Sequence, residues 1–215
     1  GKKPESIRKA REFIRSLRAG GNTDVYSSIR TLAEIKRRPG RPAVAILVTD
    51  GLPTSGLTDS ADIIARFSRI NDGTMSVFTM GTVGNANTYL LDLLSYCNKG
   101  DVYVITRGRW EIPSAIQGLM EQVSRPVMAD LSFRFAEGTG AEVYPVLSSD
   151  LYLDRPLVLY GRYPQDNKRV VFQAVGRGGD VKCDMIFDID LSDAEFTSDD
   201  QIRTSWAKQK IYHLL

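Results

Sequence analysis

The stretch Ala43-Val44-Ala45-Ile46-Leu47-Val48-Thr49-Asp50-Gly51 decides the fold class of this chain. Its six leading apolar residues are typical of a strand that is covered on both faces, as strands of a parallel sheet are. Asp50 follows at the carboxyl end of that strand. Because ligands of open parallel sheets bind beyond the carboxyl ends of the strands, Asp50 is a candidate binding residue.

Helix and strand patterns alternate on both sides of this stretch. Apolar residues at helical spacing predict helices within residues 7–17, 25–35, 63–70, 88–97 and 112–123. Two further apolar runs, Met75–Met80 and Val102–Ile105, predict the next strands. This alternation indicates an α/β fold with a doubly wound, Rossmann-like parallel sheet over residues 1–125.

After about Pro126 the apolar residues mostly follow the period of a strand. Four further β-like runs are separated by turns at 138–140, 165–167 and 176–180; the runs are 141–146, 157–163, 169–175 and 182–191. They predict a small antiparallel, β-sandwich-like module over residues 126–196. Ser198-Asp199-Asp200-Gln201 is a capping box that opens a C-terminal helix. We expect this helix, residues 197–215, to pack on the preceding domains through Ile202, Trp206, Lys210, Ile211 and Leu214.

Composition excludes several classes of protein. With 42% hydrophobic and 25% charged residues, the chain is typical of a soluble globular protein, and it has no apolar run long enough to insert into a membrane. The net charge is only +2, and acids and bases are interspersed, which disfavours a nucleic-acid partner. Cys97 and Cys183 fit neither a metal-binding spacing nor a disulfide framework, so we expect two free, mostly buried thiols.

A candidate metal site follows from the loops near the carboxyl ends of the strands. Thr23 and Asp24 lie in a loop just ahead of the first strand, and Asp50 leaves that strand. If these side chains converge, their hard oxygen atoms suit Mg²⁺ better than zinc. Each piece also has a structural interpretation, because Asp50-Gly51 is a common turn and Thr23-Asp24 a common helix N-cap.

The order of these motifs carries a family resemblance. Gly20-Gly21-Asn22-Thr23-Asp24-Val25, then Ile46-Leu47-Val48-Thr49-Asp50-Gly51-Leu52-Pro53-Thr54, then Met80-Gly81-Thr82-Val83-Gly84 resemble the later half of a von Willebrand factor A domain. The following segments, such as Arg125-Pro126-Val127, Leu159-Tyr160-Gly161-Arg162-Tyr163 and Trp206-Ala207, resemble the region behind that domain in inter-alpha-trypsin inhibitor heavy-chain-like proteins. The resemblance covers nearly the whole chain.

The resemblance implies a metal-ion-dependent adhesion site. Such a site is built from an Asp-x-Ser-x-Ser loop, a loop that supplies Thr and a loop that supplies Asp. Thr23 and Asp50 match the second and third loops, and Asp24 is a further possible ligand. We expect Mg²⁺ or another divalent cation in the intact parent protein and none bound in this chain alone. The expected contacts with a partner are Gly21, Asn22, Gly51 and Thr54.

The same resemblance implies that the sheet is truncated, because the Asp-x-Ser-x-Ser loop and its central strand would lie before residue 1. That absence would leave Ala43–Val48 as an exposed apolar edge, which is an aggregation liability. We expect another chain, a swapped element or a segment of this chain to cover it, so a homo-oligomer or a domain swap is one outcome.

The function implied is a non-catalytic module for protein binding and adhesion, secreted or in the cell envelope, whose metal captures a carboxylate of a protein partner. Catalytic motifs are missing: there is no G-x-S-x-G, P-loop or H-E-x-x-H, and His213 suits a packed surface position. One alternative is a Mg²⁺-dependent enzyme or phospho-receiver, but neither Gly81–Gly84 nor Thr106-Arg107-Gly108 offers the Lys it requires. Another is a structural scaffold with a degenerate metal site.

Overall fold

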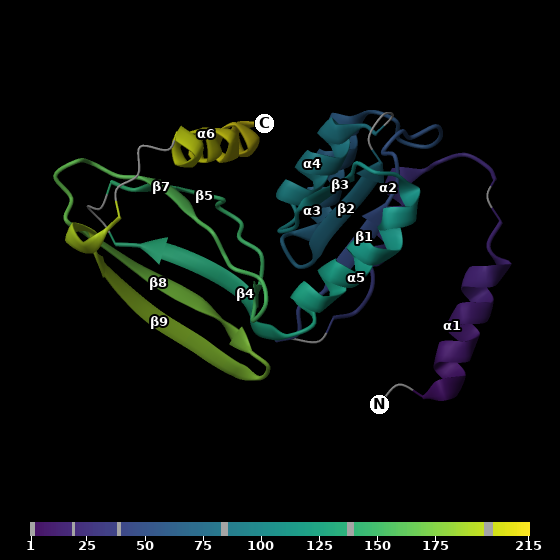
Figure 1. The fold of residues 1–215 in the computed structure, drawn as a ribbon, viewed down its shortest axis with the longest axis horizontal. Helices are drawn as coiled ribbons and strands as arrows, with labels where there is room; N and C mark the ends of the chain where they lie inside the picture. The colour runs from purple at the N-terminus through teal and green to yellow at the C-terminus, as the bar shows by residue number, and fades with distance from the viewer. Residues whose placement is uncertain (1–2, 19, 38–39, 83–85, 137–139, 196–199) are drawn as a thin grey trace.

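The α/β half comes first in the chain (Figure 1). The computed structural model describes residues 3–18, 20–37, 40–82, 86–136, 140–195 and 200–215. The α/β half contains the helices α1 (Pro4–Ser16), α2 (Val25–Ala33), α3 (Ser60–Asn71), α4 (Thr88–Tyr96) and α5 (Ile112–Val123). Its strands are β1 (Val44–Val48), β2 (Ser76–Thr82) and β3 (Val102–Ile105), and the short helix η1 (Arg109–Glu111) precedes α5.

The β-rich half follows. It contains β4 (Pro126–Phe135), β5 (Glu142–Tyr144), β6 (Leu151–Tyr152), β7 (Tyr160–Arg162), β8 (Arg169–Gly178) and β9 (Val181–Asp190). The short helix η2 (Leu191–Asp193) and the final helix α6 (Asp200–Leu214) complete the chain. The predicted fold class, a parallel α/β sheet with helices followed by antiparallel strands and a C-terminal helix, is confirmed. The predicted domain boundaries at residues 125 and 196 stay a prediction.

The first three strands form a parallel sheet in the order β1-β2-β3. Val48 lies opposite Met80, and Thr82 lies opposite Ile105, so the three strands end at the same edge of the sheet. The loops that leave β1 and β2 therefore start side by side, at the edge where open parallel sheets bind ligands.

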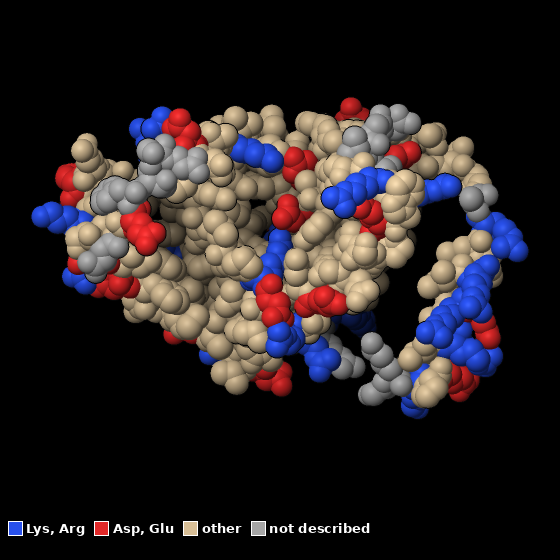
Figure 2. Space-filling model, in the orientation of Figure 1, with Lys and Arg blue, Asp and Glu red and all other residues tan. Residues whose placement is uncertain are grey.

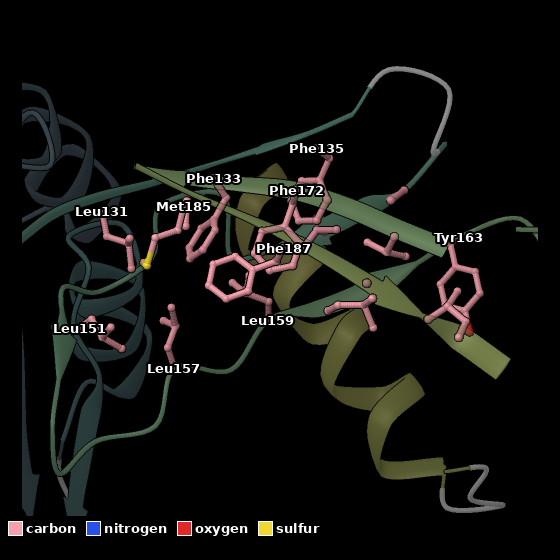
Figure 3. A pocket seen from close by; sticks show the side chains of 17 residues that line it. Leu131, Phe133, Phe135, Leu151, Leu157, Leu159, Tyr163, Phe172, Met185 and Phe187 are labelled. Carbon is pink, nitrogen blue, oxygen red and sulfur yellow. The ribbon is translucent and has the colours of Figure 1, made fainter. Parts of the chain in front are cut away.

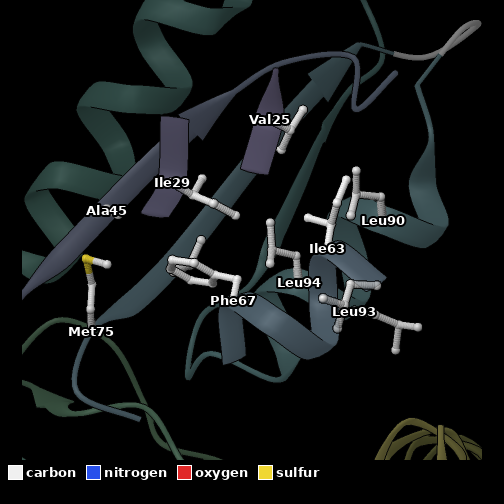
Figure 4. Packing of buried hydrophobic residues seen from close by; sticks show 11 residues of the cluster. Val25, Ile29, Ala45, Ile63, Phe67, Met75, Leu90, Leu93 and Leu94 are labelled. Carbon is white, nitrogen blue, oxygen red and sulfur yellow. The ribbon is translucent and has the colours of Figure 1, made fainter. Parts of the chain in front are cut away.

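Helices cover both faces of this sheet. Neighbouring residues of β2 point to opposite faces, so each face presents apolar side chains to its helices. Val77 faces a cluster built from α2, α3 and α4, in which Phe67 and Leu94 are fully buried (Figure 4). Phe78 faces the other side and packs with Leu119 of α5. Each such side chain contributes roughly 1.5–3 kcal/mol when it leaves water. The two-sided core makes the sheet doubly wound.

β1 differs from the predicted strand in its burial. It pairs with β2 alone, so it is an edge strand, as the truncation implied. As predicted, both faces of the strand are covered, since Ala45 packs among α2, α3 and α4 and Ile46 packs on the opposite side near Leu119, but the cover is incomplete and Val48 is 45% exposed. A hollow of about 400 Å³ lies along it, lined by Leu32, Ile35, Val44, Ile46 and others. No described element pairs with the outer edge of β1.

α1 forms where the apolar periodicity predicted it, but its apolar stripe is not packed. Phe13 and Ile14 are 65% and 63% exposed, and no residue of the helix is buried. Figure 1 shows α1 standing apart from the sheet and its covering helices. The stripe is therefore a second apolar surface of the α/β half that has no partner among the described residues.

The β-rich half contains a four-stranded sheet in the order β6-β4-β8-β9 and a two-stranded ribbon of β5 and β7. β6 was not predicted, because two residues are too short to show a period. The sheet and the ribbon enclose an apolar cavity of about 470 Å³, which Figure 3 shows with Phe133, Phe172 and Phe187 in its wall. The module is thus sandwich-like, with an incompletely filled interior.

Two local predictions in this half need correction. Gly176 does not belong to a turn but lies within β8, opposite Cys183. A Cβ at Gly176 would come within 2.4 Å of Met128, so a glycine lets β4 approach closely. The register shift near Asp130, whose φ is 55°, interrupts the predicted alternation of β4. Cys97 and Cys183 are free, as expected, but only half-buried.

α6 packs against both halves. Trp206 Nε1 donates to the carbonyl of Glu142 at 3.0 Å, and the Tyr96 hydroxyl donates to the carbonyl of Gln209 at 3.0 Å. The predicted stripe is wrong in part, because Ile211 and Leu214 are 55% and 72% exposed. Of the predicted capping box, Ser198 and Asp199 lie outside the described residues.

Candidate functional site

Backbone hydrogen bonds tie together two of the loops that the sequence singled out. The Thr23 N–H donates to Thr54 Oγ1 at 2.8 Å. In return, the N–H groups of Thr54 and Ser55 donate to the Thr23 carbonyl at 2.9 and 3.3 Å. The loop ahead of α2 therefore lies against the loop that follows β1. The structure brings Thr23 to the loop that Asp50 begins.

Asp50 is exposed at the carboxyl end of β1. Its Oδ1 accepts the Leu52 N–H at 3.1 Å, which closes a local turn. Its carbonyl accepts the Asn87 N–H at 2.7 Å, so the loop after β1 is also bound to the start of α4. Within the part of the chain that is described, Asp50 Oδ2 and the Thr23 hydroxyl have no hydrogen-bond partner. Both oxygens are thus available to a ligand.

Gly51 sets the direction of this loop. Its φ of +70° is one that side chains with a Cβ rarely adopt, and a Cβ there would lie 3.1 Å from Leu91 Cγ. Gly51 is also buried, whereas Gly21 and Asn22 are exposed in the neighbouring loop. The predicted contacts of Gly21, Asn22, Gly51 and Thr54 with a partner stay a prediction.

Asp24 acts as the N-cap of α2, where its Oδ1 accepts the Ser27 N–H at 2.9 Å. Hydrogen bonds from the backbone and then the hydroxyl of Ser27 hold the pKa of Asp24 below its usual value. The carboxylate also lies against Gly56, since a Cβ on Gly56 would come within 2.4 Å of Asp24 Oδ2. The structural interpretation of Asp24 is therefore correct, and its role as a metal ligand stays a prediction.

The third loop, which follows β2, starts beside the loop that follows β1. A Cβ at Gly81 would lie 2.7 Å from Leu91 Cδ1 and 3.3 Å from the carbonyl of Thr49. The side chain of Thr82 and all of Val83 and Gly84 lie outside the described residues. Their contribution to the candidate site therefore stays a prediction.

Asn87 is a residue of this region that the sequence reasoning missed. It caps α4 by accepting the Leu90 N–H at 3.1 Å, and its Nδ2 donates to Ser60 Oγ at 2.9 Å. Together with its bond to Asp50, these contacts connect α3, α4 and the loop after β1. An Asn directly ahead of the apolar spacing of α4 is an N-cap signal that could have identified it.

The described residues alone form only part of a metal site. Among them, no group of three His, Cys, Asp or Glu side chains could hold a metal ion. Mg²⁺ takes six oxygen ligands and often keeps several waters. Thr23 and Asp50 together would supply two of the six.

This chain has sequence relatives among known proteins. No family model matches the sequence. Human inter-alpha-trypsin inhibitor heavy chain H6 is 27% identical over 188 residues, which are 81% of this chain and 14% of that protein. Human heavy chain H1 is 22% identical over 227 residues, which are 98% of this chain and 25% of that protein. This chain is similar to the inter-alpha-trypsin inhibitor heavy chains. It spans between 14% and 25% of the length of these two relatives.

The fold has a counterpart of known structure. The protein described as von Willebrand factor type A from Catenulispora acidiphila matches with a TM-score of 0.63 and 18% identity. The match covers 98% of this chain and 56% of that one, so it includes the β-rich half and α6. The resemblance seen in the order of the sequence motifs is confirmed, and the fold is of the von Willebrand factor A type.

The charged surface is mixed. On the face in Figure 2, Lys and Arg alternate with Asp and Glu over both halves of the molecule. Within the described ranges, every helix is too short or too polar to cross a bilayer. The single histidine, His213, is exposed and packs its ring 5.4 Å from that of Tyr144.

Proposed function

We propose that this chain is part of a non-catalytic protein-binding module of adhesion type. The similarity to inter-alpha-trypsin inhibitor heavy chains and the von Willebrand factor A fold support an interaction role. The observation that carries the proposal is the set of hydrogen bonds that hold the Thr23 loop against the Asp50 loop at the carboxyl edge of the sheet. By the same similarity, we propose that the parent protein is secreted or lies in the cell envelope.

The donor set fits a hard divalent cation such as Mg²⁺. Asp50 offers a carboxylate oxygen and Thr23 a hydroxyl oxygen, both exposed and without other partners in the described structure. Two such ligands with one negative charge leave room for waters and for further ligands, which we propose come from residues outside this chain. When bound, the metal would attract a carboxylate of a protein partner. Asp50 and Thr23 would hold the metal ion. The β-rich half and α6 would support the α/β half that carries this site.

A calorimetric titration with Mg²⁺ tests the proposal on the full-length parent protein. Asp50→Asn is the sharpest variant, because the amide oxygen can still accept the Leu52 N–H while the charge is lost. We expect the variant to weaken Mg²⁺ binding by at least about tenfold, since a charged ligand is removed. Asp166→Asn, in the turn between β7 and β8, is the matched control and should bind as the wild type does.

Two results would overturn the metal proposal. One is the absence of any saturable Mg²⁺ binding by the parent protein. The other is binding that Asp50→Asn leaves unchanged. Either result would favour a structural scaffold, in which Asp50 only closes its turn with Leu52.

The open edge of β1 bears on the partners of this chain. Unpaired strand edges with apolar residues associate with other strands. We propose that a segment or a chain outside the described residues pairs with β1 and covers the hollow beside Val44 and Ile46. Sedimentation of the 215-residue chain would show self-association if a second copy takes this role, and a monomer would exclude it.

A further inference from the structure

The strand β9 has a long free edge in the β-rich half. The sheet runs in the order β6-β4-β8-β9, so β9 pairs with a described strand on one side only, and it forms the lower border of this half in Figure 1. Every residue from Val181 to Asp190 lies opposite a residue of β8, without a register shift. The strand therefore has neither a bulge nor a proline, two of the devices that keep strand edges from pairing.

The backbone groups at this edge belong to the even-numbered residues. The N–H of Leu191, directly after β9, donates to the Lys168 carbonyl at 2.8 Å, at the start of β8. Because backbone groups alternate in direction along an antiparallel strand, the odd-numbered residues of β9 direct theirs toward β8. The groups that point outward, where no described strand pairs with them, are those of Lys182, Asp184, Ile186, Asp188 and Asp190.

Both faces of β9 also expose apolar side chains. Met185 and Phe187 face the apolar cavity of about 470 Å³ and are exposed at its margin (Figure 3). Ile186, on the opposite face, is 75% exposed. A strand added beside β9 would therefore bury apolar surface on both faces and narrow the open side of the cavity.

The charges on the face of Ile186 identify the strand that fits. Lys182 has no ion-pair partner among the described residues, and it lies opposite Arg177, which carries the same charge. Asp184 and Asp188 follow on the same face of the strand. A suitable partner strand places a carboxylate beside Lys182 and no carboxylate beside either aspartate.

The β9 strand of a second copy meets these requirements. The outward backbone groups match when even-numbered residues face even-numbered ones, so a two-fold axis passes through one residue. With the axis at Met185, residues 181–189 of the two antiparallel strands overlap. Lys182 of each copy then lies opposite Asp188 of the other, and Asp184 lies opposite Ile186.

Neighbouring registers are worse. An axis at Asp184 or at Ile186 sets aspartates directly opposite aspartates, which is destabilising. An axis at Cys183 leaves only residues 181–185 paired. With the axis at Met185, Asp180 and Asp190 meet only past the ends of the overlap, where water and salt screen them.

We propose that two copies of this chain pair through β9 in the antiparallel register centred on Met185. The contact uses the same surface on both copies, so it closes as a dimer and does not propagate. It joins the two four-stranded sheets into one continuous sheet. The cavity-facing side chains of the two strands lie side by side on one face of that sheet, because residues of the same parity share a face.

Analytical ultracentrifugation of the 215-residue chain tests the proposal with two charge reversals. Wild-type chains should form dimers at about 100 μM or below. Lys182→Glu and Asp188→Lys each turn both attractive pairs into repulsive ones and should weaken dimerisation by at least about tenfold. Arg66→Glu, on the exposed face of α3, is the matched control and should dimerise as the wild type does.

An equimolar mixture of Lys182→Glu and Asp188→Lys chains should recover dimerisation, because the two introduced charges then lie opposite each other. Asp188→Lys also breaks the exposed ion pair with Arg169. Mixing does not repair that pair, so recovery reports the contact between copies alone.

Cross-linking tests the register separately. Met185 faces its own copy at a pair without hydrogen bonds, where Cα atoms of antiparallel strands lie about 4.5 Å apart, within the reach of a disulfide. In a chain that carries Cys97→Ser and Cys183→Ser, Met185→Cys should give a disulfide-linked dimer on oxidation. Ile189→Cys, on the same face of β9, should not.

The proposal is overturned if wild-type chains stay monomeric at about 200 μM, or if the mixture of the two variants does not recover. Self-association that both charge reversals leave unchanged also overturns it, in favour of the open edge of β1. Asp50→Asn should dimerise as the wild type does, which separates this contact from the metal proposal.

Discussion

Replacing Lys99 by methionine removes the cation from a buried ion pair between the two halves of the molecule. Lys99, just ahead of β3, places its Nζ 3.0 Å from Oδ1 of Asp150, just ahead of β6. The two side chains are only 7% and 4% exposed. Methionine keeps the length of the aliphatic stem, so the variant isolates the charge. Among the residues that the structure describes, Asp150 then keeps one hydrogen-bond partner, the N–H of Asp130 at 3.0 Å.

The expected cost follows from this geometry. Removing one partner of a buried pair leaves a charge without compensation and costs roughly 3–5 kcal/mol. We expect the lower end, about 3 kcal/mol, because the Asp130 N–H still stabilises the carboxylate. For a chain of this length, that loss lowers the melting temperature by about 6–12 °C. The double variant Lys99→Met/Asp150→Asn should recover about half of the lost free energy, since no charge is left buried.

Urea unfolding, followed by circular dichroism and by tryptophan fluorescence in a Trp110→Phe background, measures the free energy of unfolding. Trp206 reports on α6 and its contact with β5. Arg169→Gln, which removes an exposed cation, should change stability by less than about 0.5 kcal/mol. A loss below about 0.5 kcal/mol in Lys99→Met would refute the reasoning, because it would mean that water already solvates Asp150. A double variant less stable than Lys99→Met would refute it as well.

Two further predictions concern the loop after β1 and the attachment of α6. Gly51→Ala should destabilise the chain by about 1–2 kcal/mol, because φ is +70° and Leu91 stands 3.1 Å from the added Cβ. Thermal unfolding should show no such effect for Gly20→Ala, whose Cβ would meet nothing within 4 Å, and equal effects would contradict the prediction. Glu142 has a pKa below its usual 4.5, chiefly through its hydrogen bond with Lys210. The folded state therefore binds the proton less readily than the unfolded state, so this contribution is present above about pH 4.5 and lost as the pH falls. In urea unfolding, the stability difference between wild type and Glu142→Gln should shrink between about pH 7 and pH 3, and a constant difference would rule out the ion pair as its cause.

The positions of most elements could be predicted from the sequence because they depend on local periodicity. Val102–Ile105 and Ile112–Val123 form the predicted strand and helix with the predicted bounds. Asp50 lies at the carboxyl end of its strand because that placement needs only the apolar run and the glycine behind it. The order of the glycine loops was also sufficient to indicate the von Willebrand factor A fold, which the structural match confirms.

Partners in space could not be predicted in the same way. The sequence does not show that Thr23 is bound to Thr54, or that Asp24 is engaged as a helix cap rather than free for a metal. These outcomes depend on how two loops, separated by about 30 residues, meet after the strands have paired. Of the proposed metal site, the sequence therefore identified the residue types, and the fold decided which oxygen atoms are free.

What the sequence determined by itself is the periodicity of each segment and the chemistry at the strand ends. What only the tertiary structure decided is which apolar faces are covered and which charges are buried. β1 and the stripe of α1 read as core segments, yet β1 is only half-buried because no described strand pairs with its outer edge, and the stripe is exposed because no described element packs on it. The local sequence does not distinguish Lys99 and Arg155 from surface cations, yet both are largely buried between the two halves. The physical reason is that burial is a property of pairs of surfaces, and a local pattern specifies only one surface of each pair.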